Sequence, residues 1–392
     1  MKFDEITKYL DSVVSDWKVP SVDCVIFQNH KQIYRHFAGT VDEKRCKPIE
    51  GNEQYLMFSM TKVITMTAIM QLVESGKLSL EDEVEKYLPA YRNIMVKDME
   101  GAPSPIPMDA PMETIAMHPA KNKLRIKHLL SMQSGLDYNL ERGGIKEVLA
   151  DKGEAATTRE IVDSFVKTPF DFEPGTRFQY SLSHDVAAAV VEVISGMSFG
   201  DYLKKNIFEP LKMNNTFFAK PMNDDVEGLA SQYIYNESDR SILLMEKSCN
   251  YQLSASYESG GAGLCSCTMD YIRLADTLAC GGMSADGIRI LKPETVELMK
   301  KDLLGEASHK DLENNMGRFG YDYGCGVAVF ARPEEVNSPA AAGVFGWDGA
   351  AGSMITMDTV RNISVVFTMH VRGFGPVYGE IHPHLRDLVF EV

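Results

Sequence analysis

The sequence lacks several features that would each indicate a particular class of protein. No apolar run reaches the roughly 18 residues that a membrane-spanning helix needs, so we expect no membrane partner. There is neither a CxxC pair nor an HExxH motif, and we expect no metal. Basic residues are too few to balance the acids: 40 Lys and Arg face 55 Asp and Glu, a formal net charge of −15. A surface this acidic repels nucleic-acid phosphates and anionic lipid head groups, so nucleic acid is not an expected partner.

The cysteines do not form a disulfide framework. There are seven, an odd number scattered over 392 residues, and Cys265 and Cys267 stand too close together for an ordinary bridge. The first residues, MKFDEITKYLDSVVSDW, are amphipathic and carry acids early, so we expect no secretory signal there. Free thiols and no signal together predict a cytoplasmic protein.

Apolar periodicity divides the chain into elements. Residues 4–17 are predicted to form a helix, and SVDCVIFQNHKQIYRHFAG two strands joined at residues 28–30. Further helices are predicted at residues 60–75, 123–135, 157–167, 184–195 and 199–206. The proline-rich segment 101–119 is predicted to be a loop. Beyond about residue 225, Gly-rich turns separate short β-branched runs, which indicates an antiparallel meander followed by a closing helix.

Strands at both ends of the chain with helices between them predict an α/β protein of the α+β type. We expect an antiparallel β-sheet flanked by helices, with a mostly helical inserted subdomain. The predicted discontinuous α/β domain covers residues 1–88 and 250–392, and the helical insertion covers residues 89–249.

One of three S-x-x-K motifs stands out by its context. Roughly one or two are expected by chance in a chain of this length. Those at residues 15–18 and 164–167 lie late in amphipathic helices, where both partners are expected to face water. Ser59 instead lies where an extended segment becomes a helix, and Lys62 falls on the same face of the first turn. Apolar neighbours would lower the pKa of that lysine, although Ser59 as a plain helix N-cap stays an alternative.

A second serine motif, GMSFG at residues 196–200, matches the G-x-S-x-G nucleophile elbow. That elbow needs a strand before its serine, but the preceding run HDVAAAVVEVIS has the composition and period of a helix. We therefore interpret Gly196 as a helix C-cap and Ser198 as the N-cap of the next helix.

Two later segments complete a pattern. EPGTRFQYSLSHD places Tyr180 in a turn ahead of a helix, and FGWDGAAGS is a Gly-rich strand near the C-terminus. With S-x-x-K, this order resembles the serine β-lactamase and penicillin-binding-protein superfamily, and LSMQSGL and ESGGAGLCSCTMDYIRLA are similar to its recurrent segments. The chain is most similar to class C β-lactamases, family VIII carboxylesterases and D-aminoacyl-peptide hydrolases. The resemblance implies a β-lactamase/transpeptidase-like fold with Ser59 as nucleophile, Lys62 as its partner and Tyr180 as a second acid/base group.

The chain departs from the lactamase pattern at two places. Leu182 replaces the asparagine of Tyr-x-Asn, and Trp-Asp-Gly at 347–349 replaces Lys-Thr-Gly. Both changes remove polar groups that would hold a β-lactam, unless another basic residue such as Lys292 or Arg318 reaches the pocket. Trp-x-Gly resembles the esterase branch. The resemblance implies that the substrate is bound by Trp347, Asp348, Gly349 and Ala350.

The resulting interpretation is a serine hydrolase that forms a covalent acyl-enzyme on small esters or amides, foremost a carboxylesterase. The oxyanion would lie between the backbone N–H groups of Ser59 and Ala350. Alternatives are a D-aminoacyl peptidase, a weak β-lactamase, or a penicillin-recognising sensor without turnover. No cofactor is implied, and the expected partner is a small-molecule ester or amide. The oligomeric state, acyl transfer to a second substrate, and the choice of Lys62 or Tyr180 as base are left open.

Overall fold

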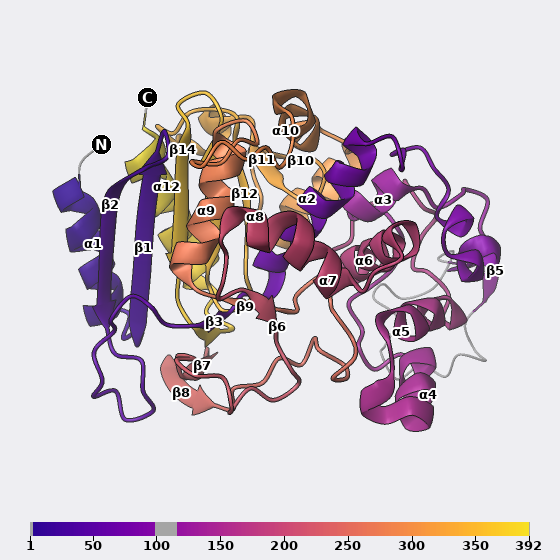
Figure 1. Cartoon of the computed structure of the whole chain (residues 1–392), viewed down its shortest axis with the longest axis horizontal. Coiled ribbons are helices and arrows are strands. Elements are labelled where there is room, and N and C mark those ends of the chain that lie inside the picture. Colours follow the sequence, from indigo (N-terminus) through magenta and orange to yellow (C-terminus); the bar gives the residue numbers. More distant parts are fainter. Residues whose placement is uncertain (1–2, 99–115, 392) are drawn as a thin grey trace.

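The centre of the computed structural model, which describes residues 3–98 and 116–391, is a seven-stranded antiparallel sheet (Figure 1). Both ends of the chain contribute to it, because N-terminal β1 pairs with β14 from Asp23↔Thr368 to Gln28↔Ile363. The strands in spatial order are β10 (Tyr321–Tyr323), β11 (Ala328–Phe330), β12 (Val344–Asp348), β13 (Met354–Asp358), β14 (Ile363–Thr368), β1 (Ser21–Gln28) and β2 (Lys31–Gly39). The predicted hairpin and meander are confirmed.

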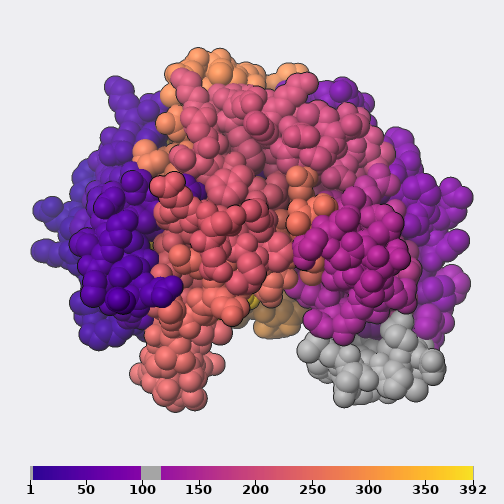
Figure 2. Space-filling model, turned by 60° about the horizontal axis from the view of Figure 1, so that its bottom comes forward, coloured from indigo at the N-terminus to yellow at the C-terminus, as the bar shows by residue number. Residues whose placement is uncertain are grey.

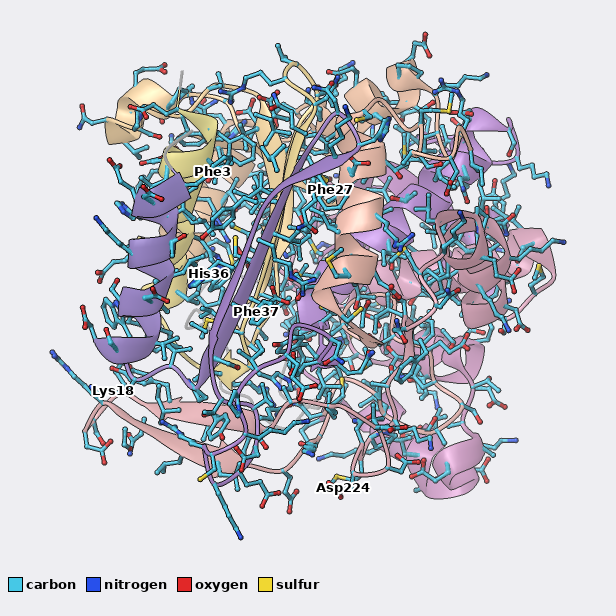
Figure 3. The ribbon with its side chains drawn as sticks, turned by 60° about the vertical axis from the view of Figure 1, so that its left-hand side comes forward. Phe3, Lys18, Phe27, His36, Phe37 and Asp224 are labelled. Atoms are coloured by element: carbon cyan, nitrogen blue, oxygen red, sulfur yellow. The ribbon has the colours of Figure 1, made fainter. Side chains whose placement is uncertain are left out.

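Helices cover both faces of this sheet. One face carries α1 (Phe3–Ser15) and α12 (His382–Phe390), the two ends of the chain (Figure 3). There the ring of Phe3 stacks on Tyr34 at 5.3 Å. The other face carries α9 (Thr268–Ala279), which packs on β14, β1 and β13. The prediction of an antiparallel sheet flanked by helices is therefore confirmed.

The helical part of the molecule surrounds α2 (Thr61–Glu74), which runs from the sheet into the helices (Figure 1). Every residue of α2 from Thr61 to Met70 is buried, so this helix belongs to the core on all sides. The other helices are α3 (Ile126–Leu130), α4 (Gly143–Lys152), α5 (Thr158–Ser164), α6 (Ser183–Ser195), α7 (Phe199–Leu203), α8 (Glu209–Leu211), α10 (Pro293–Lys300) and α11 (Glu306–Met316). A polar side chain on the first turn of α2 is thereby held in an apolar environment.

Three small sheets complete the fold. The β7–β8 hairpin forms the projecting lobe at the bottom of Figure 2, identified by its colour. The first small sheet contains β3 (Tyr55–Leu56), β9 (Leu264–Ser266) and β6 (Phe217–Phe218). The second contains β15 (Val371–Arg372), β7 (Gln232–Asn236) and β8 (Ser241–Met245). The third contains β4 (Met95–Lys97) and β5 (Met117–Pro119).

Two local predictions need correction. The predicted helix at 123–135 is shorter, because only Ile126–Leu130 is helical and Met132 already turns the chain with a φ of +57°. Of the predicted loop 101–119, residues 101–115 lie outside the described residues, and Met117–Pro119 forms β5. The division of the chain into domains at residues 88 and 249 stays a prediction.

Two further expectations concern the whole chain. All seven cysteines are free, as expected. Within the described ranges no single helix is long and apolar enough to cross a membrane. One bent pair, Ser183–Ser195 with Phe199–Leu211, meets the requirement of length and composition when taken together.

Candidate active site

The segment that carries Ser59 is a sharp turn between β3 and α2. A short 3-10 helix, Phe58–Met60, connects the two. Phe58 has a φ of +47°, a left-handed conformation that is rare for an aromatic residue and costs on the order of 1–3 kcal/mol. Such strain is concentrated at functional sites. The N-cap residue of α2 is Met60, which makes no side-chain cap hydrogen bond, so the interpretation of Ser59 as a plain N-cap is wrong.

Lys62 lies directly above the Ser59 hydroxyl. Its Nζ atom donates to Ser59 Oγ at 3.2 Å, to Tyr138 Oη at 3.1 Å and to the carbonyl of Gly261 at 2.8 Å. The lysine side chain is completely buried, whereas Ser59 keeps 8% of its surface exposed. The serine is therefore the member of the pair that a substrate can reach.

The environment of Lys62 favours its neutral form. Burial lowers the pKa of Lys62 to about 7, although the charges of Asp185 and Asp348 raise it. Asp185 is itself fully buried and accepts hydrogen bonds from Ser259 Oγ at 2.6 Å and Tyr257 Oη at 2.8 Å. Its second oxygen has no hydrogen-bond partner in the described part of the chain. Near neutral pH, Lys62 can thus both accept and return a proton.

Tyr180 lies on the other side of the same amine. Lys62 Nζ is 4.5 Å from the centre of the Tyr180 ring, and Trp347 Nε1 donates to Tyr180 Oη at 3.0 Å. Burial raises the pKa of Tyr180 well above 10, and the hydrogen bonds from Ser59 and Trp347 oppose this only in part. The structure therefore brings Ser59, Lys62, Tyr180 and Trp347 together, with the phenol protonated.

A second tyrosine completes the group. Tyr138 receives the bond from Lys62 Nζ, stacks on Tyr180 at 5.5 Å and meets the ring of Tyr251 edge-on at 5.4 Å. Sequence reasoning missed it. Its only sequence signal is its place two residues after the LSMQSGL segment, which had already been singled out.

The other serine motifs show no comparable pair. Ser164 Oγ donates to the carbonyl of Ile161 and is buried rather than facing water, while Lys167 pairs with Glu147. Ser198 caps α7 by accepting from the Asp201 amide at 3.1 Å, and helix α6 precedes it. The prediction that GMSFG is a helix end and a cap is confirmed.

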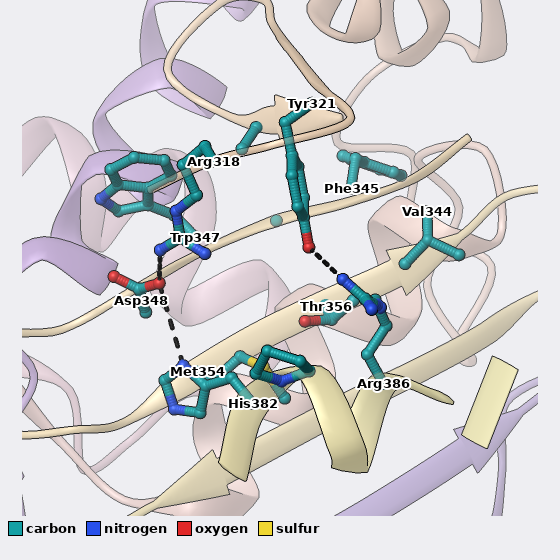
Figure 4. Close-up of a pocket in the computed structure, with 13 residues that line it drawn as sticks. Arg318, Tyr321, Val344, Phe345, Trp347, Asp348, Met354, Thr356, His382 and Arg386 are labelled. Atoms are coloured by element: carbon teal, nitrogen blue, oxygen red, sulfur yellow. Dashed lines mark hydrogen bonds and ion pairs between the residues drawn. The ribbon is translucent and has the colours of Figure 1, made fainter. Parts of the chain in front are cut away.

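The two side chains of the Trp-Asp pair point to opposite faces of β12. Trp347 is 3% exposed and packs edge-on against Tyr323 on the face that carries Tyr180. Asp348 pairs with Arg318 and lies 3.9 Å from His382 Nδ1 of α12, on the opposite face (Figure 4). The Asp348 carboxylate is therefore paired with Arg318, although its charge still acts on Lys62 and Tyr180.

Gly349 and Ala350 link β12 to the Ser59 turn. A Cβ atom on Gly349 would lie 2.4 Å from the carbonyl oxygen of Met57, closer than any real contact. Only glycine allows this approach. Ala350 packs against the small apolar cluster that contains Phe58. The end of β12 is thus held directly against the residues before Ser59.

Two groups of side chains in the described ranges could hold a metal ion. They are His30, Asp276 and Cys280, and Asp302, His309 and Asp322. Neither group contains a residue that is hydrogen-bonded to Lys62.

Comparisons with curated proteins find relatives along most of the chain. An uncharacterised protein of Mycobacterium tuberculosis is 25% identical over 350 residues, 88% of this chain and 84% of that protein. Esterase EstB of Burkholderia gladioli is 24% identical over 409 residues, 97% of this chain and 93% of its own. Acyltransferase mokF of Monascus pilosus is 27% identical over 273 residues, 69% of this chain and 62% of its own. These relatives indicate a hydrolase or acyltransferase.

Solved structures share the fold. EstCE1, a hydrolase with promiscuous acyltransferase activity, superposes with a TM-score of 0.77 at 24% identity, over 99% of this chain and 98% of its own. Simvastatin synthase LovD from Aspergillus terreus superposes with a TM-score of 0.76 at 18% identity. The superposition covers 100% of this chain and 98% of the LovD chain. The family model named Beta-lactamase matches residues 6–389, a range that includes every residue of the site described above. By fold and by sequence, this chain belongs to the beta-lactamase family.

Proposed function

We propose that this chain is a carboxylesterase that hydrolyses small esters through a covalent acyl-enzyme on Ser59. The observation that carries the proposal is the bond from Lys62 Nζ to Ser59 Oγ, made by a buried amine whose pKa is about 7. A serine hydroxyl is a weak nucleophile until a neighbouring base takes its proton. The strained turn and the reachable hydroxyl fit the same role.

The raised pKa of Tyr180 favours Lys62 as the base. Neutral Lys62 accepts the Ser59 proton while Oγ attacks the ester carbonyl, and the oxyanion is stabilised by the backbone N–H groups of Ser59 and Ala350. When the intermediate collapses, the carbon–oxygen bond to the alcohol breaks, and Lys62 and Tyr180 return the proton to the leaving alkoxide. Water then repeats the sequence on the acyl-enzyme, releasing the acid and free Ser59.

Acyl transfer is the second candidate, supported by relatives whose names describe acyltransferases. It differs only in the last step, where an alcohol takes the place of water. Comparing product acid with transferred ester in the presence of added alcohol separates the two. A cytoplasmic location stays part of the proposal.

The test is covalent labelling with a fluorophosphonate followed by peptide mapping. The label is expected on Ser59 and absent from a folded Ser59→Ala variant, which should also lose ester turnover. Ser198→Ala is the matched control, because that serine caps a helix. A label on Ser198, or an active Ser59→Ala protein, would overturn the proposal. A single burst of product without turnover would instead identify a sensor.

A further inference from the structure

Arg372, the last residue of β15, has no acidic partner. Its guanidinium carbon lies 5.3 Å from the ring centre of Phe58 and 5.9 Å from that of Tyr251, and the side chain is half-buried. No carboxylate pairs with it among residues 3–98 and 116–391. A guanidinium lying on aromatic rings keeps its in-plane N–H groups free for a planar anion such as a carboxylate.

This cation lies beside the candidate active site. Val371 N donates to the carbonyl of Ala351 at 3.1 Å, so β15 runs along the residues that follow the Trp-Asp-Gly triplet. Phe58 directly precedes Ser59 in the chain. Tyr251 is in edge contact with Tyr138, the ring that receives the bond from Lys62. Arg372 is therefore one layer of aromatic rings away from the reacting groups.

A second cation adds to the positive charge there. Lys247 is also without an acidic partner in the described part of the chain, and it acts with Arg372 on the buried His370. Burial, together with these two positive charges, lowers the pKa of His370 to about 4. Two uncompensated cations at one place are unusual in a protein with a net charge of −15.

Neither of the basic residues suggested by the sequence supplies this charge. Arg318 lies 5.3 Å from the ring centre of Trp347, but its charge is paired with that of Asp348. Lys292 is exposed at the start of α10, where its backbone amide binds Glu74. Arg372, by contrast, lies against Phe58 and has no acidic partner among the described residues.

We propose that Arg372 forms an anion subsite and that the preferred substrates are esters carrying a carboxylate. The inference rests on the proposed esterase function and names its substrate class. The carboxylate binds the free N–H edge of Arg372 in a charge-assisted, bidentate arrangement, while Ser59 attacks the ester carbonyl. Neutral esters of the same size lack this contact and are turned over less efficiently.

The experiment compares matched esters in the native protein and in Arg372→Met. One pair places the carboxylate on the acyl half, mono-4-nitrophenyl glutarate against 4-nitrophenyl pentanoate. The other places it on the alcohol half, 4-acetoxybenzoate against 4-acetoxybenzamide. The ratio of kcat/KM for the anionic ester to that for the neutral one should fall about tenfold or more in at least one pair, as loss of a charge-assisted bond requires. The pair affected shows which half of the ester faces Arg372.

Two further variants make the result specific. Arg372→Lys should retain part of the ratio, because it keeps the charge and loses the bidentate geometry. Arg45→Met is the matched control, since Arg45 also lies on an aromatic ring, 4.9 Å from the centre of Tyr233, but is exposed and bonds Lys18 and Ile242. An equal ratio in Arg372→Met and the native protein, in both pairs, would overturn the subsite. That outcome differs from failure of the esterase proposal, in which neither ester is turned over.

Discussion

At the scale of single residues, the buried amine of Lys62 is the feature on which the proposed chemistry depends. Its burial follows from its place on the first turn of α2, a helix whose neighbouring residues are all buried. Desolvation disfavours the ammonium form and brings the pKa to about 7, while three oxygen atoms satisfy the amine. A lysine in water, with a pKa of about 10.4, would be a base for only a minute fraction of the time at neutral pH.

The first prediction is that Lys62 and Tyr180 act as one proton-transfer unit. Lys62→Ala and Tyr180→Phe should each lower kcat/KM roughly a hundred- to ten-thousand-fold, the usual range for general acid–base groups. The double variant should be little worse than either single one, because each loss already disables the unit. Steady-state kinetics on one ester checks this. Losses that multiply would show that the two residues have independent roles.

The second prediction concerns pH. Because Lys62 acts as a base in its neutral form, kcat/KM should rise with pH through a midpoint of about 7. The negative charge of Asp185 raises the pKa of Lys62, so Asp185→Asn should move that midpoint to lower pH. Ser259→Ala is the control, since it removes the hydrogen bond that Ser259 donates to Asp185 but leaves the Asp185 carboxylate in place. An unmoved midpoint in Asp185→Asn would mean that the carboxyl is protonated and does not act on Lys62.

Sequence spacing predicted those site residues that lie within a local motif. Ser59 and Lys62 share one helical turn, so their contact follows from helix geometry. Tyr138 reaches the site from a distant segment, and no local period marks it. Asp348 was expected to bind substrate beside Trp347, and strand geometry explains why it pairs with Arg318. Successive side chains of a strand point to opposite faces of the sheet. Because Trp347 points towards Tyr180, the side chain of Asp348 points towards α12.

At the scale of helices and strands, most strongly periodic apolar segments were predicted, but the largely buried helix α9 was not. The meander from β10 to β14 and the helices α1, α2, α5 and α6 were all found. By contrast, α11 was not predicted, because only Ser308, Asp311 and Leu312 of its eleven residues are buried and the apolar period is weak. Strand β5 was also missed, since it is three residues long and lies at the end of a proline-rich run.

The third prediction tests the contact between β12 and the Ser59 turn. Gly349→Ala should lower both the melting temperature and kcat/KM, because the added methyl group would meet the Met57 carbonyl at 2.4 Å. The expected cost is about 1–3 kcal/mol, as for other overpacked sites. Gly379→Ala is the control, since Gly379 has open space around its Cβ position. If the two variants behave alike in thermal melts and in ester assays, the close approach does not constrain the site.

At the scale of the whole molecule, charge is distributed unevenly around the site. The chain carries 15 more acids than bases, yet Arg372, which lies against Phe58 and Tyr251, has no acidic partner among the described residues. Asp348, which directly follows Trp347 in the chain, is paired with Arg318. Repulsion between a negatively charged ester and the acids elsewhere on the surface is screened beyond about 8 Å at physiological salt.

The last prediction is that short-chain aryl esters are turned over better than β-lactams. Leu182 is buried and cannot exchange a side-chain hydrogen bond where the lactamases place asparagine, and Trp347 replaces their lysine without its charge. Each lost charge-assisted bond is worth about 1.5–3 kcal/mol, so kcat/KM for nitrocefin should fall at least roughly tenfold below that for 4-nitrophenyl butyrate. Repulsion by Asp348 is not counted in this difference, because its charge is paired with that of Arg318. If nitrocefin is turned over equally well, Arg372→Met decides the reason. Loss of that activity would show that Arg372 takes the place of the missing lysine, and its retention would mean that the Trp347 triplet does not exclude β-lactams at all.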